Sequence, residues 1–318
     1  MAENQDYTFI VQQLERMSTK MDEISKEVQL TNIEIAKLNG MKHTLNDFKT
    51  WKENVESAVN AEDLRLMKSA LNDVKQHAED MDKVEKDIEG LPAPVQRYFR
   101  YVLKNGQEYI RFVDMKAEGK FRRPLQKQWA KTTTHQYFIT KPLGMIFDAS
   151  MKQNSVMWFD VRDKYYRKKG GMFVNLLSGF NVLNESDVKE LNNTTFLRCI
   201  GEAVMFPTFL LPSEYIKWEP IDKNSAKGIV TDGNNKGIYT FYFNDAGEIV
   251  KYESDDRYDR IDGKLQRVGS VAVRSDYKEI DGIKVPTKFL ITRILPDGIH
   301  EEFWKGEITN IQFNVLKK

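Results

Sequence analysis

Apolar side chains follow a helical period through the first part of the chain. Over residues 10–45 they recur at alternating spacings of four and three, with mostly polar residues between them. A stripe this narrow cannot be shielded by one helix alone, so it needs a partner helix. The pattern predicts a coiled coil in which this segment pairs with the same segment of one or two further copies of the chain, as a dimer or trimer. The predicted seam consists of Ile10, Leu14, Met17, Met21, Ile24, Val28, Ile35 and Leu38.

A second apolar run, from Leu64 to Ile88, keeps a similar spacing and ends at Gly90 and the prolines of LPAP. Two alternatives stay open for residues 1–89. The two runs form a helical hairpin within one chain, or the first run builds an oligomeric arm. The greater regularity of the first run favours the oligomeric arm.

From residue 90 onwards the period changes to the alternation of β-strands. Runs such as QWAKTTTHQYFIT and SVMWFDVRDKYYRK are separated by turn signals such as NDAG and LPDG. About eleven or twelve such runs predict one large antiparallel sheet that curls into a half-barrel. An apolar helical insert at about residues 186–211 interrupts them, and we expect it to cover the concave face as a lid. The predicted fold class is therefore α+β, with a helical coiled-coil arm over 1–89 and a β half-barrel over 90–318.

Composition and charge support this division. All nine prolines lie at Pro92 or later, and residues 1–90 carry 12 Lys and Arg against 19 Asp and Glu. The remainder carries 36 basic against 28 acidic residues. The net charge of the whole chain is +1, which gives no indication of a nucleic-acid partner.

Targeting signals were sought at the start of the chain and among its apolar runs. The N-terminus has no basic region followed by an apolar core, and no stretch reaches the roughly 18 apolar residues of a spanning helix. Cys199 is the only cysteine, so no disulfide can form within the chain. We expect a cytoplasmic protein, with a phage-like particle or secretion without a signal as alternatives.

A series of motifs runs in order from about residue 88 to 314. They are LPAPVQRYFRYVLKNGQ, GEAVMFPTFLLPSEYIKWEPIDKNSAK, FYFNDAGEIVKYESDDRY, DYKEIDGIKVPTK and WKGEITNI. In these motifs the chain resembles a family of uncharacterised bacterial proteins, whose members commonly read EAVWFPTALLP where this chain has Met205. The architecture is similar to lipoprotein-carrier (LolA-like) half-barrels, which implies a curved sheet and a helical lid around an acyl-binding cavity. The family implies no reaction. Its members often carry transmembrane helices where this chain has an acidic arm.

The residues on which most enzyme chemistry depends are sparse. The four histidines, His43, His77, His135 and His300, lack the spacing of a zinc site, and one cysteine cannot form a metal-binding cluster. The GxSxG and phosphate-loop patterns are absent from the sequence. The sequence predicts no catalytic residue, no metal and no cofactor, and favours a binding module over an enzyme.

Glu202 is the one ionisable residue of the apolar run GEAVMFPTFLLP, and burial of a lone carboxylate is costly. Three explanations stay open. Arg198 pairs with Glu202 from one turn earlier, a partner such as a strand arginine or a backbone amide lies elsewhere in the domain, or the carboxylate faces a ligand. The candidate ligand-binding residues are Glu202, Met205, Phe206, Phe209, Leu210, Trp158 and Trp218.

The leading hypothesis is a non-enzymatic binding module for a lipid, an acyl chain or another hydrophobic ligand, displayed on an oligomeric arm. An alternative is a structural protein of a larger particle, such as a phage-like or secretion apparatus, with a packed β domain. A minor alternative is an enzyme that acts on a lipid or ester through Glu202.

Overall fold

A computed structural model describes residues 84, 86–104 and 107–315 of the chain. The predicted coiled-coil seam, Ile10 to Leu38, and nearly all of the predicted arm lie outside the described residues. Both alternatives for the arm therefore stay predictions. None of the described helices is both long enough and apolar enough to span a bilayer.

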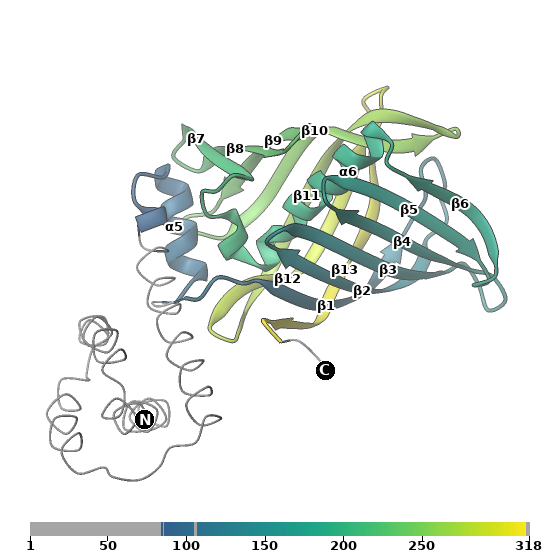
Figure 1. Ribbon diagram of the computed structural model, residues 1–318, viewed down its shortest axis with the longest axis horizontal. Helices are drawn as coiled ribbons and strands as arrows, with labels where there is room; N and C mark the ends of the chain where they lie inside the picture. The colour runs from purple at the N-terminus through teal and green to yellow at the C-terminus, as the bar shows by residue number, and fades with distance from the viewer. Residues whose placement is uncertain (1–83, 85, 105–106, 316–318) are drawn as a thin grey trace, which may run out of the picture. The chain divides into compact units, whose positions relative to one another are not determined.

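The described part of the chain forms a single antiparallel sheet of thirteen strands in the order β6-β5-β4-β3-β2-β1-β13-β12-β11-β10-β9-β8-β7. The strands are β1 (Phe112–Phe121), β2 (Ala130–Thr140), β3 (Leu143–Lys152), β4 (Trp158–Tyr166), β5 (Lys169–Leu176), β6 (Phe180–Ser186), β7 (Ile216–Asp222), β8 (Ser225–Asp232), β9 (Asn235–Phe243), β10 (Ile249–Ile261), β11 (Lys264–Ile280), β12 (Ile283–Ile294) and β13 (His300–Phe313). The sheet is strongly curled (Figure 1), and the predicted antiparallel half-barrel is confirmed.

Each strand presents alternate residues to the inside of the curl because successive side chains point to opposite faces. In β2 the residues from Ala130 to Phe138 alternate between buried positions and exposed or half-buried ones. The inward positions of this strand include Thr132, Thr134 and Gln136, so the inner face mixes polar side chains with apolar ones.

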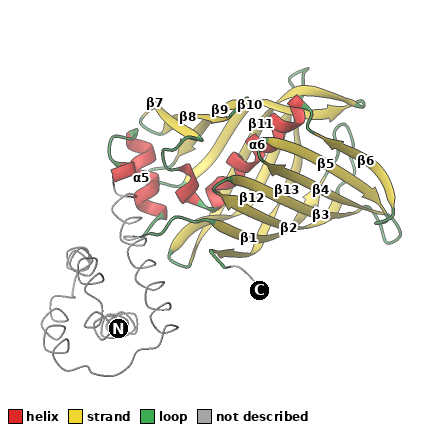
Figure 2. Cartoon of the chain, viewed as in Figure 1, coloured by secondary structure: helices red, strands yellow, loops and turns green. Residues whose placement is uncertain are grey.

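Helix α6 (Lys189–Glu202) connects β6 to β7, which are the two edge strands of the sheet. It packs against β4 and β5 on one side and against β8, β9 and β10 on the other. Figure 2 shows the helix lying along the inside of the curled sheet. Two short 3₁₀ segments, Ala203–Met205 and Pro207–Leu210, follow it. The helix lies within the range predicted from sequence for the helical insert.

Two glycines let α6 approach the strands closely. A Cβ atom added at Gly170 of β5 would lie 2.0 Å from the hydroxyl of Thr195, and one added at Gly237 of β9 would lie 2.6 Å from Leu197. At Gly170 the added atom would also lie 2.7 Å from the Leu191 carbonyl oxygen, so a larger residue there would displace the helix backbone. At Gly237 only the end of the Leu197 side chain would have to move. Gly170 therefore sets how closely α6 approaches β5.

Helix α5 (Ala93–Val102) precedes the sheet and begins with Pro94 in its first turn, where a missing N–H costs nothing. Its apolar face buries Val95, Tyr98, Phe99 and Val102. The helix packs against β8, β9 and β12.

Side chains also link strands that lie far apart in the order of the sheet. The Tyr165 hydroxyl of β4 donates to Asp232 Oδ2 at 2.6 Å and accepts from Asn235 Nδ2 at 3.0 Å. Arg260 of β10 forms an ion pair with Glu185 of β6. These contacts join the β4–β6 end of the sheet to the β8–β10 end.

We expect Tyr165→Phe to lower the free energy of unfolding by about 2 kcal/mol, because Asp232 and Asn235 would lose a shared partner. Urea unfolding followed by circular dichroism measures this change. Tyr166→Phe is the matched control, because Tyr166 is 46% exposed on the opposite face. Equal stability of the two variants would show that the link between the two ends of the sheet contributes nothing.

Candidate functional site

A cavity of about 140 Å³ lies between α6 and the inner face of the sheet. One part of its wall is apolar and consists of side chains from the five strands β1, β3, β4, β12 and β13. The members of this apolar wall are Phe121, Phe147, Met151, Val161, Ile291 and Trp304. The other part carries charge, from α6 and from strands β4, β10 and β11. The charged members are Asp163, Arg198, Glu202, Arg257, Asp259 and Arg274.

Arg198 of α6 forms an ion pair with Asp163 of β4, and its guanidinium also lies 3.6 Å from the centre of the Phe147 ring. Asp163 is only 3% exposed, and its second carboxylate oxygen, Oδ1, has no hydrogen-bond partner among the described residues. Burial raises the pKa of Asp163, and the nearby Arg198 opposes that rise. The carboxyl group therefore holds a buried acceptor without a partner, in a residue that lines the cavity.

Glu202, at the end of α6, has Arg274 of β11 as its partner. Arg274 Nη2 lies 3.4 Å from Glu202 Oε2 and donates to the Tyr252 hydroxyl at 2.6 Å. The Tyr252 hydroxyl in turn donates to the carbonyl of Gly201 at 2.5 Å. Burial raises the pKa of Tyr252, so this hydroxyl keeps its proton. Of the three explanations for Glu202, the strand arginine is confirmed as its partner, whereas Arg198 pairs with Asp163 instead.

A third group of charges lies farther along the cavity. Arg257 Nη1 donates to the Ser270 hydroxyl at 3.2 Å, and Arg293 Nη1 donates to Asp259 Oδ2 at 2.8 Å. Arg293 is only 1% exposed, and burial lowers its pKa. The described residues hold no group of three or more His, Cys, Asp and Glu side chains placed to bind a metal ion.

Of the seven residues that the sequence selects, Glu202 lines this cavity and the other six pack elsewhere. Met205 and Leu210 are fully buried, and the Phe206 ring packs against Phe138 and Phe209.

The two tryptophans of the predicted set have hydrogen-bond partners outside the cavity. The Trp218 indole donates to the Leu210 carbonyl at 2.8 Å, and its ring contacts Phe241. The Trp158 indole donates to the Ser178 hydroxyl at 3.1 Å.

Sequence reasoning missed Asp163 and Arg274. A signal for both was present, because each occupies an inward position of an alternating strand. Asp163 stands two residues from buried Tyr165, and Arg274 stands two residues from buried Ala272. A charge on the inward face of a strand needs a partner from another element.

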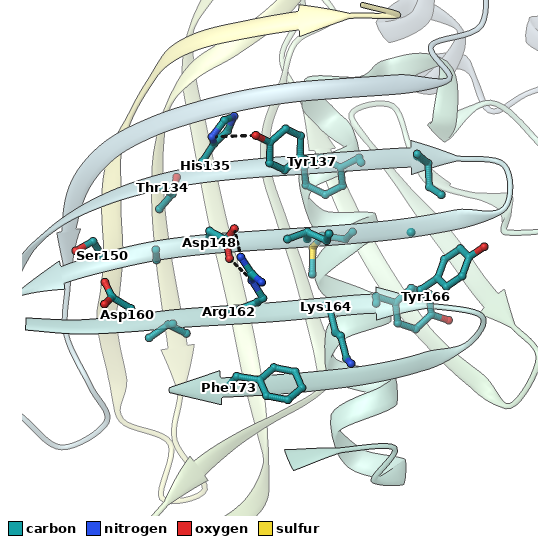
Figure 3. Close-up of a pocket in the computed structure, with 18 of the residues that line it drawn as sticks. Thr134, His135, Tyr137, Asp148, Ser150, Asp160, Arg162, Lys164, Tyr166 and Phe173 are labelled. Carbon is teal, nitrogen blue, oxygen red and sulfur yellow. Dashed lines mark hydrogen bonds and ion pairs between the residues drawn. The ribbon is translucent and has the colours of Figure 1, made fainter. Parts of the chain in front are cut away.

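A second hollow, of about 1280 Å³, lies on the outer face of β1–β5 (Figure 3). Several of its polar side chains have partners of their own. Arg162 forms a two-pronged ion pair with Asp148 at 2.5 and 2.9 Å, and His135 Nε2 lies 2.7 Å from Asp114 Oδ1. This groove is open to solvent, and Tyr166 on its wall is 46% exposed. A small apolar guest would lose less of its water-exposed surface here than in the more enclosed cavity beneath α6.

Comparison with known proteins found a family and distant structural neighbours. The model of a family of unknown function, DUF6920, matches residues 89–313, which confirms the resemblance carried by the motifs. No curated protein matches the chain.

Two solved structures are similar to the chain. A DUF1329 family protein from Desulfovibrio piger has 13% identity and a TM-score of 0.40, and the match covers 74% of this chain and 95% of that one. A LolA superfamily protein from Nitrosomonas europaea has 10% identity and a TM-score of 0.35, with 72% and 96% covered. Neither score is high enough to assign a function.

Replacement of Arg274 tests the buried ion pair. We expect Arg274→Met to lower the free energy of unfolding by about 3 kcal/mol, because Glu202 would be left buried without a partner. The double variant with Glu202→Gln should recover much of that loss. Arg162→Met is the matched control, since its pair with Asp148 is exposed and should cost less than about 1 kcal/mol. A double variant no more stable than Arg274→Met would contradict the pairing.

Proposed function

The chain belongs to DUF6920, a family of unknown function, and we propose that its β domain is a non-enzymatic binding module. The module encloses a small apolar or amphipathic molecule beneath α6. The observation that carries this proposal is a partly enclosed cavity with an apolar wall on one side and buried charges on the other. Sites for small ligands commonly combine these two features.

The volume of the cavity limits the guest. A cavity of about 150 Å³ in another protein holds benzene, so about 140 Å³ suits one ring or about six carbons. A longer acyl chain needs more room, which displacement of α6 from the sheet would supply. A lipid ligand therefore requires the helix to move as a lid, whereas a small guest does not.

The charged wall favours a particular polar group on the guest. Arg198 pairs with Asp163, Arg274 with Glu202 and Asp259 with Arg293, so a free ion would disturb pairs that are already made. The Oδ1 atom of Asp163 is an unused acceptor. A guest with a hydroxyl or amine group would donate to that atom after a small shift of the side chains that cover it.

Two features support binding rather than catalysis. The thiol of Cys199 is fully buried, and burial raises its pKa, so it stays protonated and a poor nucleophile. The Asp163 and Glu202 carboxylates are each held by an arginine. In this proposal Glu202 contributes to the wall, and residues 1–89 display the domain as an oligomeric arm.

Filling the cavity should abolish binding. Ala272 lines the cavity and is 2% exposed, so Ala272→Leu places three further carbons in the space that the guest would occupy. We expect the natural chain to bind hexan-1-ol and the variant to bind it at least about tenfold more weakly, by isothermal titration calorimetry. Val273→Leu is the control. Val273 is the next residue after Ala272, and its side chain is 41% exposed on the other face of the sheet.

A chain that binds no apolar molecule at all, or an Ala272→Leu variant that binds equally well, would overturn the proposal. If the chain binds no apolar molecule and native mass spectrometry also detects no bound ligand, the alternative of a packed β domain in a larger assembly is favoured.

The polar group of the guest can be tested with two isomers. Hexan-1-ol donates a hydrogen bond, whereas 1-methoxypentane has the same atoms and can only accept one. We expect the alcohol to bind about tenfold more tightly, because only it can satisfy Asp163 Oδ1. Asp163→Asn should reduce the difference in affinity between the two isomers, since the amide of asparagine can donate to the ether. Asp148→Asn, on the outer face of the sheet, should leave that difference unchanged. Equal affinity of the natural chain for both isomers would exclude this role of Asp163.

A further inference from the structure

Three neighbouring turns form one rim of the sheet. They are the β1–β2 loop, the β3–β4 turn and the β5–β6 turn, and their strands are consecutive neighbours. The Arg123 guanidinium of the first loop lies 5.4 Å from the ring of Phe159, and the Leu177 amide donates to the Trp158 carbonyl at 3.1 Å. We call residues 122–131, 152–158 and 176–182 the basic rim. Figure 1 shows the β5–β6 turn at the end of the sheet away from α5.

The basic rim exposes large apolar side chains at its turns. They are Leu125, Val156, Met157, Phe180 and Val182, with exposed fractions from 41% for Met157 to 74% for Val156. Scattered exposed apolar residues are ordinary on a protein surface, but several on adjoining turns indicate an interaction surface.

The same segments carry positive charge only. Their cations are Arg122, Arg123, Lys127, Lys131 and Lys152, and none of the three segments contains an Asp or a Glu. Two further turns each contain an acidic residue, Asp262 between β10 and β11 and Asp297 between β12 and β13. The β4–β5 turn is also basic, with Arg167, Lys168 and Lys169. What distinguishes the basic rim is the combination of cations with several exposed apolar side chains on neighbouring turns.

We propose that the basic rim docks onto an anionic lipid bilayer. Cations near such a surface are attracted to its headgroups, each strengthening partitioning by about fivefold. Apolar side chains beside them enter the boundary between headgroups and acyl chains. A nucleic acid would use the cations but leave the apolar tips in water. The combination of both kinds of side chain on one rim is what an anionic bilayer complements.

The cavity and the basic rim are close together along the chain. Phe121, at the end of β1, and Met151, near the end of β3, line the cavity and directly precede the rim segments. The apolar wall is therefore the part of the cavity that lies next to the rim segments along the chain. Docking itself does not require an occupied cavity, so the two proposals can fail separately.

Sedimentation of the full chain with vesicles tests the docking. We expect the protein to bind vesicles that contain phosphatidylglycerol and phosphatidylcholine, to bind pure phosphatidylcholine vesicles weakly, and to dissociate as salt is raised. Val156→Ser with Phe180→Ser should weaken binding by at least about tenfold, through lost apolar burial. Lys127→Glu with Lys152→Glu should weaken it further and reduce its dependence on salt.

Matched controls separate the rim from the rest of the chain. Ile238→Ser with Val273→Ser removes two exposed apolar side chains, 46% and 41% exposed, that lie outside the rim segments, and should bind vesicles as the natural chain does. Ala272→Leu should also bind vesicles normally, which separates this test from that of the cavity. Absence of binding to anionic vesicles, or equal binding by the rim variants, would overturn the proposal. A change in oligomeric state caused by Phe180→Ser would also overturn the proposal, because it would indicate that the rim is an interface between protein chains.

Discussion

The close packing of α6 against both ends of the curled sheet is the contact on which the cavity depends. The helix is held between Gly170 and Gly237, where a single added carbon would collide with it. A curled sheet alone would leave its inner face open to water. With α6 in place, the inner face becomes an interior, and a polar group on that face is costly unless it finds a partner within the protein.

The buried ion pairs follow from that enclosure. Asp163 and Arg274 point inward from opposite parts of the sheet, and α6 supplies a partner for each, Arg198 and Glu202. Such pairs add little net stability, because desolvation offsets most of their attraction. They do fix the rotation and register of the helix, since a turn in either direction would break both pairs and leave four charges unpaired. The packing of glycines sets how close α6 lies, and the charges set which face it presents.

Much of the fold follows from local pattern, whereas the site does not. Alternation in runs such as β2 predicts which residues point inward, and the apolar insert predicts α6, because both properties are set by neighbouring residues. The partner of Glu202 is set by the curl of the sheet, which brings Arg274 to it from 72 residues away. Likewise, the cavity avoids Met205 and Phe206, since their apolar side chains fill their own space completely. A cavity can be located only when the positions of all the surrounding side chains are known.

The unfilled space and the unused acceptor support the same interpretation. A purely structural core would gain by closing the space around Phe147 and Met151, because a void forfeits dispersion contacts. It would also gain by giving Asp163 Oδ1 a donor, since a buried acceptor without a partner is costly. Both costs occur beside each other, at the boundary between the apolar wall and the charges. One amphipathic molecule, with a donor at one end, would remove both costs at once, whereas a water molecule would satisfy only the acceptor.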